Sequence, residues 1–130
     1  MNQSNDPSLA LDDNLPVVDV DQVSFLVPTS ADEDNMLADL LGIFASESEP
    51  RLKQIRLSCE TRDNEALKKL VHFVAGSSAN LGALRLSTLC RQVEASLNEG
   101  VFSGYAELPQ ALEHAYQEGL DALRREALLN

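Results

Sequence analysis

The stretch LKKLVHFVAGSSANLGALRLSTLCRQVEASL, residues 67–97, contains two amphipathic segments separated by a short link, LGA at residues 81–83. In both segments, apolar or small residues recur every three or four positions, which is the period of one helix face. They are Leu67, Leu70, Val71, Val74, Ser78 and Leu81 in the first segment, and Leu86, Leu89, Cys90, Val93 and Leu97 in the second. Gly82 can adopt the left-handed conformation that such a link requires. The stretch therefore predicts two helices joined by a tight turn, the first of them capped by Asp63.

A third stripe of the same period precedes this stretch. It consists of Leu37, Leu41, Phe44, Ser48, Leu52, Ile55 and Cys59. Pro50 interrupts the stripe, because proline cannot donate to the carbonyl of Ser46, but the stripe stays in phase across it. We therefore expect one kinked helix rather than two, with a capping box at Ser30 and Glu33 before it. A fourth helix is expected from about residues 105–128, with Pro109 tolerated in its first turn.

Four amphipathic segments without any alternating strand pattern predict an all-α protein. The expected architecture is a four-helix up-down-up-down bundle with a short N-terminal helix, spanning residues 21–130. The short helix falls in DQVSFLV, residues 21–27, and is expected to place Val23, Phe25 and Leu26 on the core. Residues 1–20 are acidic and lack a helical period, so they are expected to form a flexible acidic N-terminal tail.

The charge distribution bears on the choice of partner. A formal net charge of −11 argues against nucleic acid and anionic membranes, because both attract basic surfaces. Within residues 51–91, however, eight residues are basic and only three are acidic. This basic segment could attract an acidic protein partner, or it could simply form solvated helix faces. No apolar run reaches the roughly 20 residues of a membrane span, and the N-terminus does not resemble a secretory signal. A cytoplasmic location is therefore expected.

The two cysteines, Cys59 and Cys90, show neither a metal-ligand spacing nor a CxxC motif. Each falls on an apolar stripe, so we interpret them as small buried hydrophobic residues. A single disulfide is the alternative, but a chain without an export signal disfavours it.

His72 does not lie on the apolar stripe of its own helix. With Leu67 at zero and 100° per residue, the stripe clusters within roughly 60° of zero, whereas His72 falls near 140°. His72 is therefore expected to be exposed, with Lys68 one turn before it and Gly76 one turn after it. Ala75, Gly76 and Ala79 would leave a shallow platform around the imidazole. Two explanations stay open for Gly76: access for a partner's backbone, or close packing of a neighbouring helix.

Several kinds of chemistry do not fit this histidine. The exposed face offers neither an orienting acid nor a nucleophile for a Ser–His–Asp arrangement. No second histidine or carboxylate has a metal-ligand spacing to His72, and the chain has no phosphate-binding loop of the GxxxxGK[ST] type. A single accessible nucleophile on a helix remains. Such a group could carry a phosphoryl group that partner proteins supply and remove.

The segment VHFVAGSSANLGALRLSTLCRQVE, residues 71–94, resembles the signature of histidine phosphotransfer (HPt) domains, the carriers of multistep two-component phosphorelays. The family pattern is roughly H-x-L-K-G-S-[SA]-x-x-[LIV]-G, followed by a helix with a Cys-x-x-[LIV]-E/Q run. The matching residues are His72, Gly76, Ser77, Ser78, Leu81, Gly82, Cys90, Val93 and Glu94. The resemblance extends over about residues 20–125 and implies the same four-helix bundle.

The resemblance also implies a function. His72 would accept a phosphoryl group from the aspartate of one response-regulator receiver domain and pass it to another, in a relay that starts at a hybrid histidine kinase. The protein would be a stoichiometric carrier without independent catalysis. It would need no cofactor of its own, since the divalent metal would belong to the receiver. It is expected to be a monomer.

One position departs from the family pattern. The family usually has lysine three residues after the histidine, and here that residue is Ala75. Lys68 and Lys69 could supply the missing charge, and together with Ala75, Gly76 and Ala79 they form the expected docking surface. The alternative is a non-transferring adaptor that binds and sequesters a receiver or a kinase.

Overall fold

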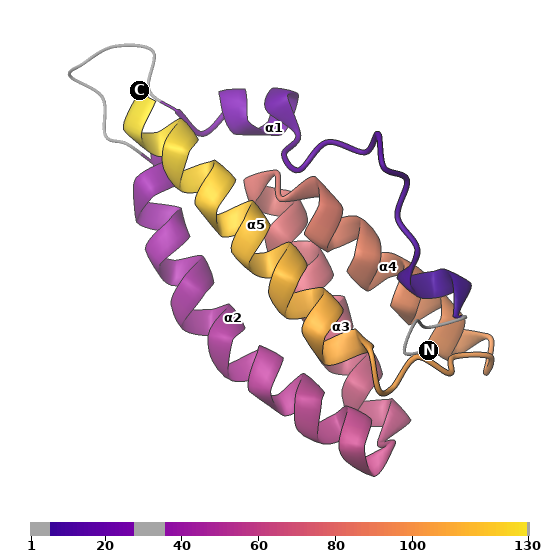
Figure 1. Ribbon diagram of the computed structural model, residues 1–130. Helices are drawn as coiled ribbons and strands as arrows, with labels where there is room; N and C mark the ends of the chain where they lie inside the picture. The colour runs from indigo at the N-terminus through magenta and orange to yellow at the C-terminus, as the bar shows by residue number, and fades with distance from the viewer. Residues whose placement is uncertain (1–5, 28–35, 130) are drawn as a thin grey trace.

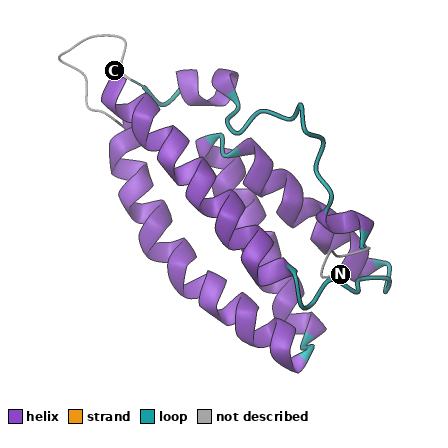
Figure 2. Ribbon diagram, in the orientation of Figure 1, coloured by secondary structure: helices purple, strands orange, loops and turns teal. Residues whose placement is uncertain are grey.

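The computed structural model describes residues 6–27 and 36–129, and in this part of the chain every regular element is a helix (Figure 1 and Figure 2). Four long helices form a bundle: α2 (Met36–Thr61), α3 (Asn64–Leu81), α4 (Leu84–Asn98) and α5 (Leu108–Leu129). Two short helices precede them, the 3₁₀ helix η1 (Pro7–Leu9) and α1 (Val20–Ser24). The predicted all-α class, with four bundle helices and a short N-terminal helix, is confirmed.

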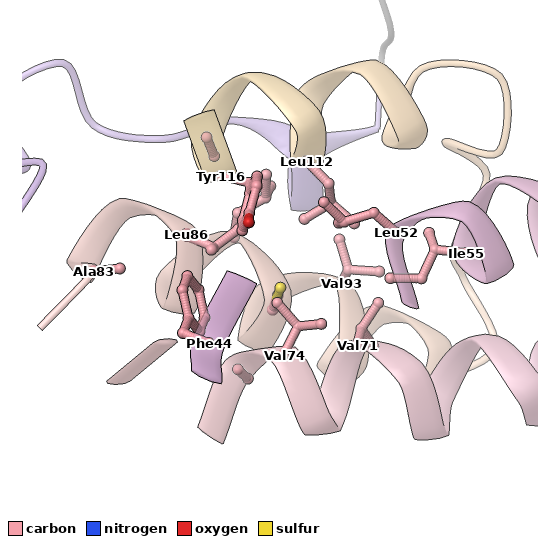
Figure 3. Packing of buried hydrophobic residues seen from close by; sticks show 14 of the residues in the cluster. Phe44, Leu52, Ile55, Val71, Val74, Ala83, Leu86, Val93, Leu112 and Tyr116 are labelled. Atoms are coloured by element: carbon pink, nitrogen blue, oxygen red, sulfur yellow. The ribbon is translucent and has the colours of Figure 1, made fainter. Parts of the chain in front are cut away.

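The long helices pack in the cyclic order α2, α3, α4, α5, so that each has two main neighbours. Links of only two residues separate α2 from α3 and α3 from α4, and such short links make consecutive helices antiparallel. The apolar stripes meet along the axis of the bundle (Figure 3). The side chains buried there include Leu37, Ile55, Leu67, Val71, Leu86, Val93, Leu112 and Leu123.

Helix α2 continues through Pro50, as the unbroken phase of its stripe predicted. All seven residues of that stripe are buried, including Ser48 and Cys59. Burial of the stripe on both sides of the proline explains the continuity, because it outweighs the loss of one backbone hydrogen bond. The capping box expected at Ser30 and Glu33 lies outside the described residues.

The links contain the residues that the sequence singled out. The carboxylate of Asp63 accepts a hydrogen bond from the N–H of Ala66 at 3.1 Å and caps α3. Gly82 ends α3 in the left-handed conformation, with φ of +87°. Its carbonyl accepts a hydrogen bond of 2.8 Å from the N–H of Asp19, so the α3–α4 link is also the attachment point for the N-terminal segment.

The N-terminal segment differs from the expectation of a flexible tail over residues 1–20. The structure packs residues 6–19 along α4 and the α4–α5 link, and Leu9 and Leu11 lie against the core. Side chains of α4 hold the backbone of this segment: Gln92 donates to the carbonyls of Ser8 and Ala10, at 3.0 and 2.9 Å. A helical period could not reveal this packing, because the segment is attached through its backbone carbonyls, the carboxylate of Asp6 and isolated apolar side chains rather than through a helix face.

The short helix α1 carries only part of its expected apolar face. Val23 is buried and Leu26 is partly buried against the core, but Phe25 is 79% exposed. The expectation for Phe25 was therefore wrong. A helix of five residues presents one side to the bundle, and Phe25 lies just beyond its end.

Candidate functional site

His72 lies on the middle of α3, and 74% of its side chain is exposed, as the helical projection predicted. The residues of α3 that are buried lie on the other side of the helix: Leu67, Val71, Val74, Ala75, Ser78 and Leu81. Because the core fixes that face, it also fixes the direction in which the imidazole leaves the bundle.

The imidazole has a partner on α4. Its Nδ1 lies 2.8 Å from Oε2 of Glu94, whose side chain is 26% exposed. The two helices are antiparallel and joined at Gly82, so residues 72 and 94 lie at the same level on either side of the link. The statement that the exposed face offers no orienting acid was therefore wrong. The family pattern had placed Glu94 in register, and a count of residues on both sides of Gly82 would have paired it with His72.

This contact determines what the ring can do. When Nδ1 carries the proton and donates it to the carboxylate of Glu94, Nε2 keeps its lone pair and faces solvent. An exposed nitrogen lone pair is a nucleophile. A carboxylate at Nδ1 also stabilises the positive charge that the ring acquires when Nε2 forms a new bond. The geometry therefore favours Nε2 of His72 as the reactive atom.

The platform around His72 is smaller than expected. Gly76 is exposed and Ala79 is partly buried, but Ala75 is only 3% exposed and packs in the core. The assignment of Ala75 to the exposed docking surface is thus contradicted. The buried arc of α3 extends further toward α4 than the apolar stripe indicated, because α3 and α4 pack closely together, and it covers Ala75 as well.

The two explanations for Gly76 can now be separated. A Cβ built on Gly76 would meet no atom within 4 Å. No helix therefore approaches close enough to require glycine there, which removes the packing explanation. Open space one turn from His72 favours the alternative, access for a partner.

The two lysines lie on different flanks of α3. Lys68 is partly buried and falls on the side of α4, whereas Lys69 is exposed and lines a groove of about 470 Å³ between α2 and α3. Leu57, Ala66 and Leu70 form apolar walls of this groove. Neither lysine forms an ion pair within residues 6–27 and 36–129.

Arg51 of α2 reaches the residue that follows His72. Its guanidinium lies 3.6 Å from the centre of the Phe73 ring, which is a close cation–π contact. Its Nη1 also donates to the carbonyl of Glu47 at 2.8 Å. No pattern within either segment predicts this contact, since it depends on the register between α2 and α3.

Other members of the basic segment are engaged away from His72. Arg56 pairs with Glu113 at 2.7 Å, and that contact raises the pKa of the guanidinium. Arg85 lies 3.4 Å from Glu118 and donates to the carbonyl of Leu15 in the N-terminal segment. Arg62 stacks on the ring of Tyr105. Three of the eight basic residues in this segment are therefore engaged with partners away from His72.

Among the described residues, no three His, Cys, Asp or Glu side chains are grouped so that they could hold a metal ion. None of the described helices combines the length and the apolarity needed to cross a bilayer. Cys59 and Cys90 are free and buried, as their places on the apolar stripes predicted.

Comparison with known proteins gives a consistent result. A family model described as "Hpt domain" matches residues 39–126. The histidine-containing phosphotransfer protein B (HptB) of Pseudomonas aeruginosa PAO1 superposes with a TM-score of 0.74 and 25% identity, over 88% of this chain and 97% of that one. The histidine-containing phosphotransfer protein MtHPt2 of Medicago truncatula has a TM-score of 0.69 and 23% identity, over 85% of this chain and 80% of that one. No curated protein matches the chain.

Proposed function

The chain belongs to the Hpt domain family, and from this premise we propose that it carries a phosphoryl group on His72 between the receiver domains of a phosphorelay. Histidine phosphotransfer in two-component signalling is the activity of the family. For this chain we assign the transfer to His72, its direction from one receiver to another, and receiver domains and a hybrid histidine kinase as the partners.

The observation that carries the proposal is the contact between Nδ1 of His72 and Glu94 on an exposed helix face. In the transfer step, the lone pair of Nε2 attacks the phosphorus of an aspartyl phosphate on the first receiver. A P–N bond forms while the P–O bond to the aspartate breaks, and the aspartate leaves as a free carboxylate. The Nδ1 proton stays on the ring, and its hydrogen bond to Glu94 stabilises the resulting charge.

The second half of the cycle reverses these bonds. The carboxylate of a second receiver attacks the phosphorus, the P–N bond breaks, and Nε2 recovers its lone pair. The divalent cation that neutralises the phosphoryl oxygens would be held by the receiver's own carboxylates. The chain then acts as a stoichiometric carrier, with a hybrid histidine kinase supplying the first receiver. We expect it to do so as a monomer in the cytoplasm.

A direct experiment is to incubate the chain with each ³²P-labelled receiver domain of the source organism. Acid-labile label should appear on His72 and should be absent from His72→Gln. Label that never appears with any receiver, or that persists in His72→Gln, would contradict the proposal.

Ala75 supports a second candidate function. It is buried and uncharged at the position where the family usually has a lysine, so this position offers a phosphoryl group on His72 no positive charge. On this hypothesis the chain binds a receiver or a kinase and sequesters it without transfer. The same incubation separates the two functions, since an adaptor would bind a receiver but would acquire no label.

A further inference from the structure

The contact between His72 and Glu94 orients the imidazole ring and thereby indicates the side from which a partner can reach Nε2. The two nitrogens of an imidazole point to nearly opposite sides of the ring, and Nδ1 is directed at Glu94 on α4. Nε2 therefore points away from α4. Because α2 and α4 pack on different sides of α3, the flank of α3 away from Glu94 is the one that α3 shares with α2.

That flank is open next to the histidine and positively charged beyond the opening. In the helical projection, Gly76 falls near 180° and Phe73 near 240°, so the bare position of Gly76 lies between His72 and Phe73. The guanidinium of Arg51 stacks on Phe73, at the same level of the bundle as His72. A protein that approaches Nε2 across Gly76 would thus meet Arg51.

Two contacts fix the position of Arg51. The cation–π contact with Phe73 holds one face of the guanidinium, and the hydrogen bond to the carbonyl of Glu47 holds Nη1. Arg51 forms no ion pair in the part of the chain that the structure describes, unlike Arg56 and Arg85. Its charge and its remaining N–H groups are therefore available to a partner, and little side-chain entropy is lost when they are used.

The two lysines of α3 are placed less favourably than Arg51. Lys68 falls near 100° in the helical projection, so it lies nearer the α4 flank than His72 does. Lys69 lies on the α2 flank, but no hydrogen bond, ion pair or ring contact of a described residue fixes its ammonium group. Ala75 contributes no charge at all.

We propose that Arg51, held on Phe73, is the residue by which this chain binds the acidic site of an incoming receiver domain. The inference rests on the proposed phosphotransfer function and assigns the docking cation to α2 rather than to α3. The partner surface that fits is a cluster of carboxylates around a phosphorylated or free aspartate, which a fixed guanidinium can engage through two N–H groups. Docking from this flank places that aspartate opposite Nε2.

The test uses Arg51→Ala, Arg51→Lys and the matched control Lys53→Ala, which removes an equal charge from an exposed position of α2. Label transfer to the full chain is measured over a range of concentrations of a ³²P-labelled receiver domain. Arg51→Ala should raise the half-saturating receiver concentration about tenfold and weaken its dependence on salt, whereas Lys53→Ala should stay within about twofold of wild type. Arg51→Lys should recover part of the loss, because it keeps the charge but not the planar fork.

A second readout separates docking from the reactivity of His72. Phosphoramidate, a small phosphoryl donor that needs no receiver, should label all variants at the wild-type rate. Equal half-saturating concentrations for Arg51→Ala and Lys53→Ala would overturn the role of Arg51 while leaving the proposed function in place.

If even the wild type acquires no label from any donor, the proposed function fails instead. Arg51 is then judged by calorimetric titration with unphosphorylated receiver domains, in which Arg51→Ala must bind more weakly than Lys53→Ala. Thermal unfolding of each variant shows whether a loss reflects an altered fold, and Phe73→Leu gives an independent check. That substitution removes the stacking contact but keeps the arginine, so it should give an intermediate loss, and a wild-type result would also overturn the inference.

Discussion

Among the described residues, the carboxylate of Glu94 is the only group that the structure places in hydrogen-bond contact with the imidazole of His72. Its role can be tested by comparing Glu94→Ala with Glu94→Gln. Glu94→Ala should lower the rate of phosphoryl transfer to His72 by roughly tenfold, because it removes the acceptor that holds Nδ1–H and compensates the charge of the ring.

Glu94→Gln keeps an oxygen acceptor and should lose less. Both rates would be measured from ³²P-labelled receiver under single-turnover conditions. Identical rates for wild type and Glu94→Ala would show that the contact does not orient the reactive ring.

Gly76 allows access and stability to be tested at one position. Gly76→Ala should raise the free energy of unfolding by about 0.5–1 kcal/mol, because alanine is the better residue in a helix interior and its Cβ meets nothing within 4 Å. Gly76→Gln should keep the fold but slow transfer from a receiver, since its side chain occupies the opening beside His72.

Urea unfolding and transfer assays measure the two effects. A Gly76→Gln protein that transfers at the wild-type rate would contradict the access explanation. A Gly76→Ala protein less stable than wild type would show that the position is not open.

For single residues, the sequence predicted which way a side chain leaves its helix better than it predicted which residue that side chain contacts. The helical projection predicted the exposure of His72, because 100° per residue determines which way a side chain leaves a regular helix. It misplaced Ala75, because the width of the buried arc depends on how closely α4 approaches. The contact with Glu94 and the stacking of Arg51 on Phe73 depend on helix register, which no single segment encodes.

Among the elements, the α3–α4 link depends most on a single residue. Gly82 has φ of +87°, and a Cβ there would lie 3.0 Å from Cγ2 of Val23 and 3.1 Å from the carbonyl oxygen of Asp19. Gly82→Ala should therefore lower the free energy of unfolding by about 1–3 kcal/mol. It should also loosen α1, which packs over the link.

Gly76→Ala is the matched control, since it makes the same chemical change within a helix and is expected to have the opposite sign. Urea unfolding measures both variants, and hydrogen exchange at α1 reports the loosening. A Gly82→Ala protein as stable as wild type would show that the link relaxes without strain.

The elements also show where sequence patterns were sufficient. The stripe of α2 stayed in phase across Pro50, and the helix is continuous because that stripe is buried on both sides. Residues 6–19 have no comparable stripe. Their place depends on α4 side chains that lie more than 80 residues away in sequence, such as Gln92, which binds the carbonyls of Ser8 and Ala10.

For the whole molecule, the buried thiols predict how stability depends on pH. Burial raises the pKa of Cys90 to about 12 and that of Cys59 to about 11. In the unfolded chain a thiol ionises near pH 8.5, so as the pH rises through that value the unfolded state releases protons that the folded state retains. The contribution of the thiols is therefore fully present below that pH and is lost as the pH rises toward the folded pKa values.

Urea unfolding between about pH 8 and pH 10.5 measures this loss. Each thiol should contribute a slope of about 1 kcal/mol per pH unit in the upper part of the range. The double variant Cys59→Ala, Cys90→Ala should be less stable at pH 7, because it leaves small cavities, but its stability should fall less steeply with pH. Equal slopes in both proteins would contradict the burial of the thiols.

The overall charge also has a different meaning once the fold is known. The net charge of −11 describes the whole chain, but the basic segment at residues 51–91 does not act as one surface. Arg56 and Arg85 pair with carboxylates of α5, and Arg62 stacks on Tyr105. What remains near His72 is a small positive area on an acidic molecule, a feature that a sum over the sequence could not locate.

The attachment of the N-terminal segment has a consequence for the evolution of such chains. Gln92 and Arg85 bind backbone carbonyls, which every residue type provides, rather than particular side chains of the segment. Apart from Leu9, Leu11 and Val18, which contact the core, and Asp6, which accepts a hydrogen bond from the N–H of Ser103, the exposed positions of residues 6–19 can therefore change without loss of attachment. Related chains that keep equivalents of Gln92 and Arg85 could retain this segment while its sequence drifts beyond recognition by alignment.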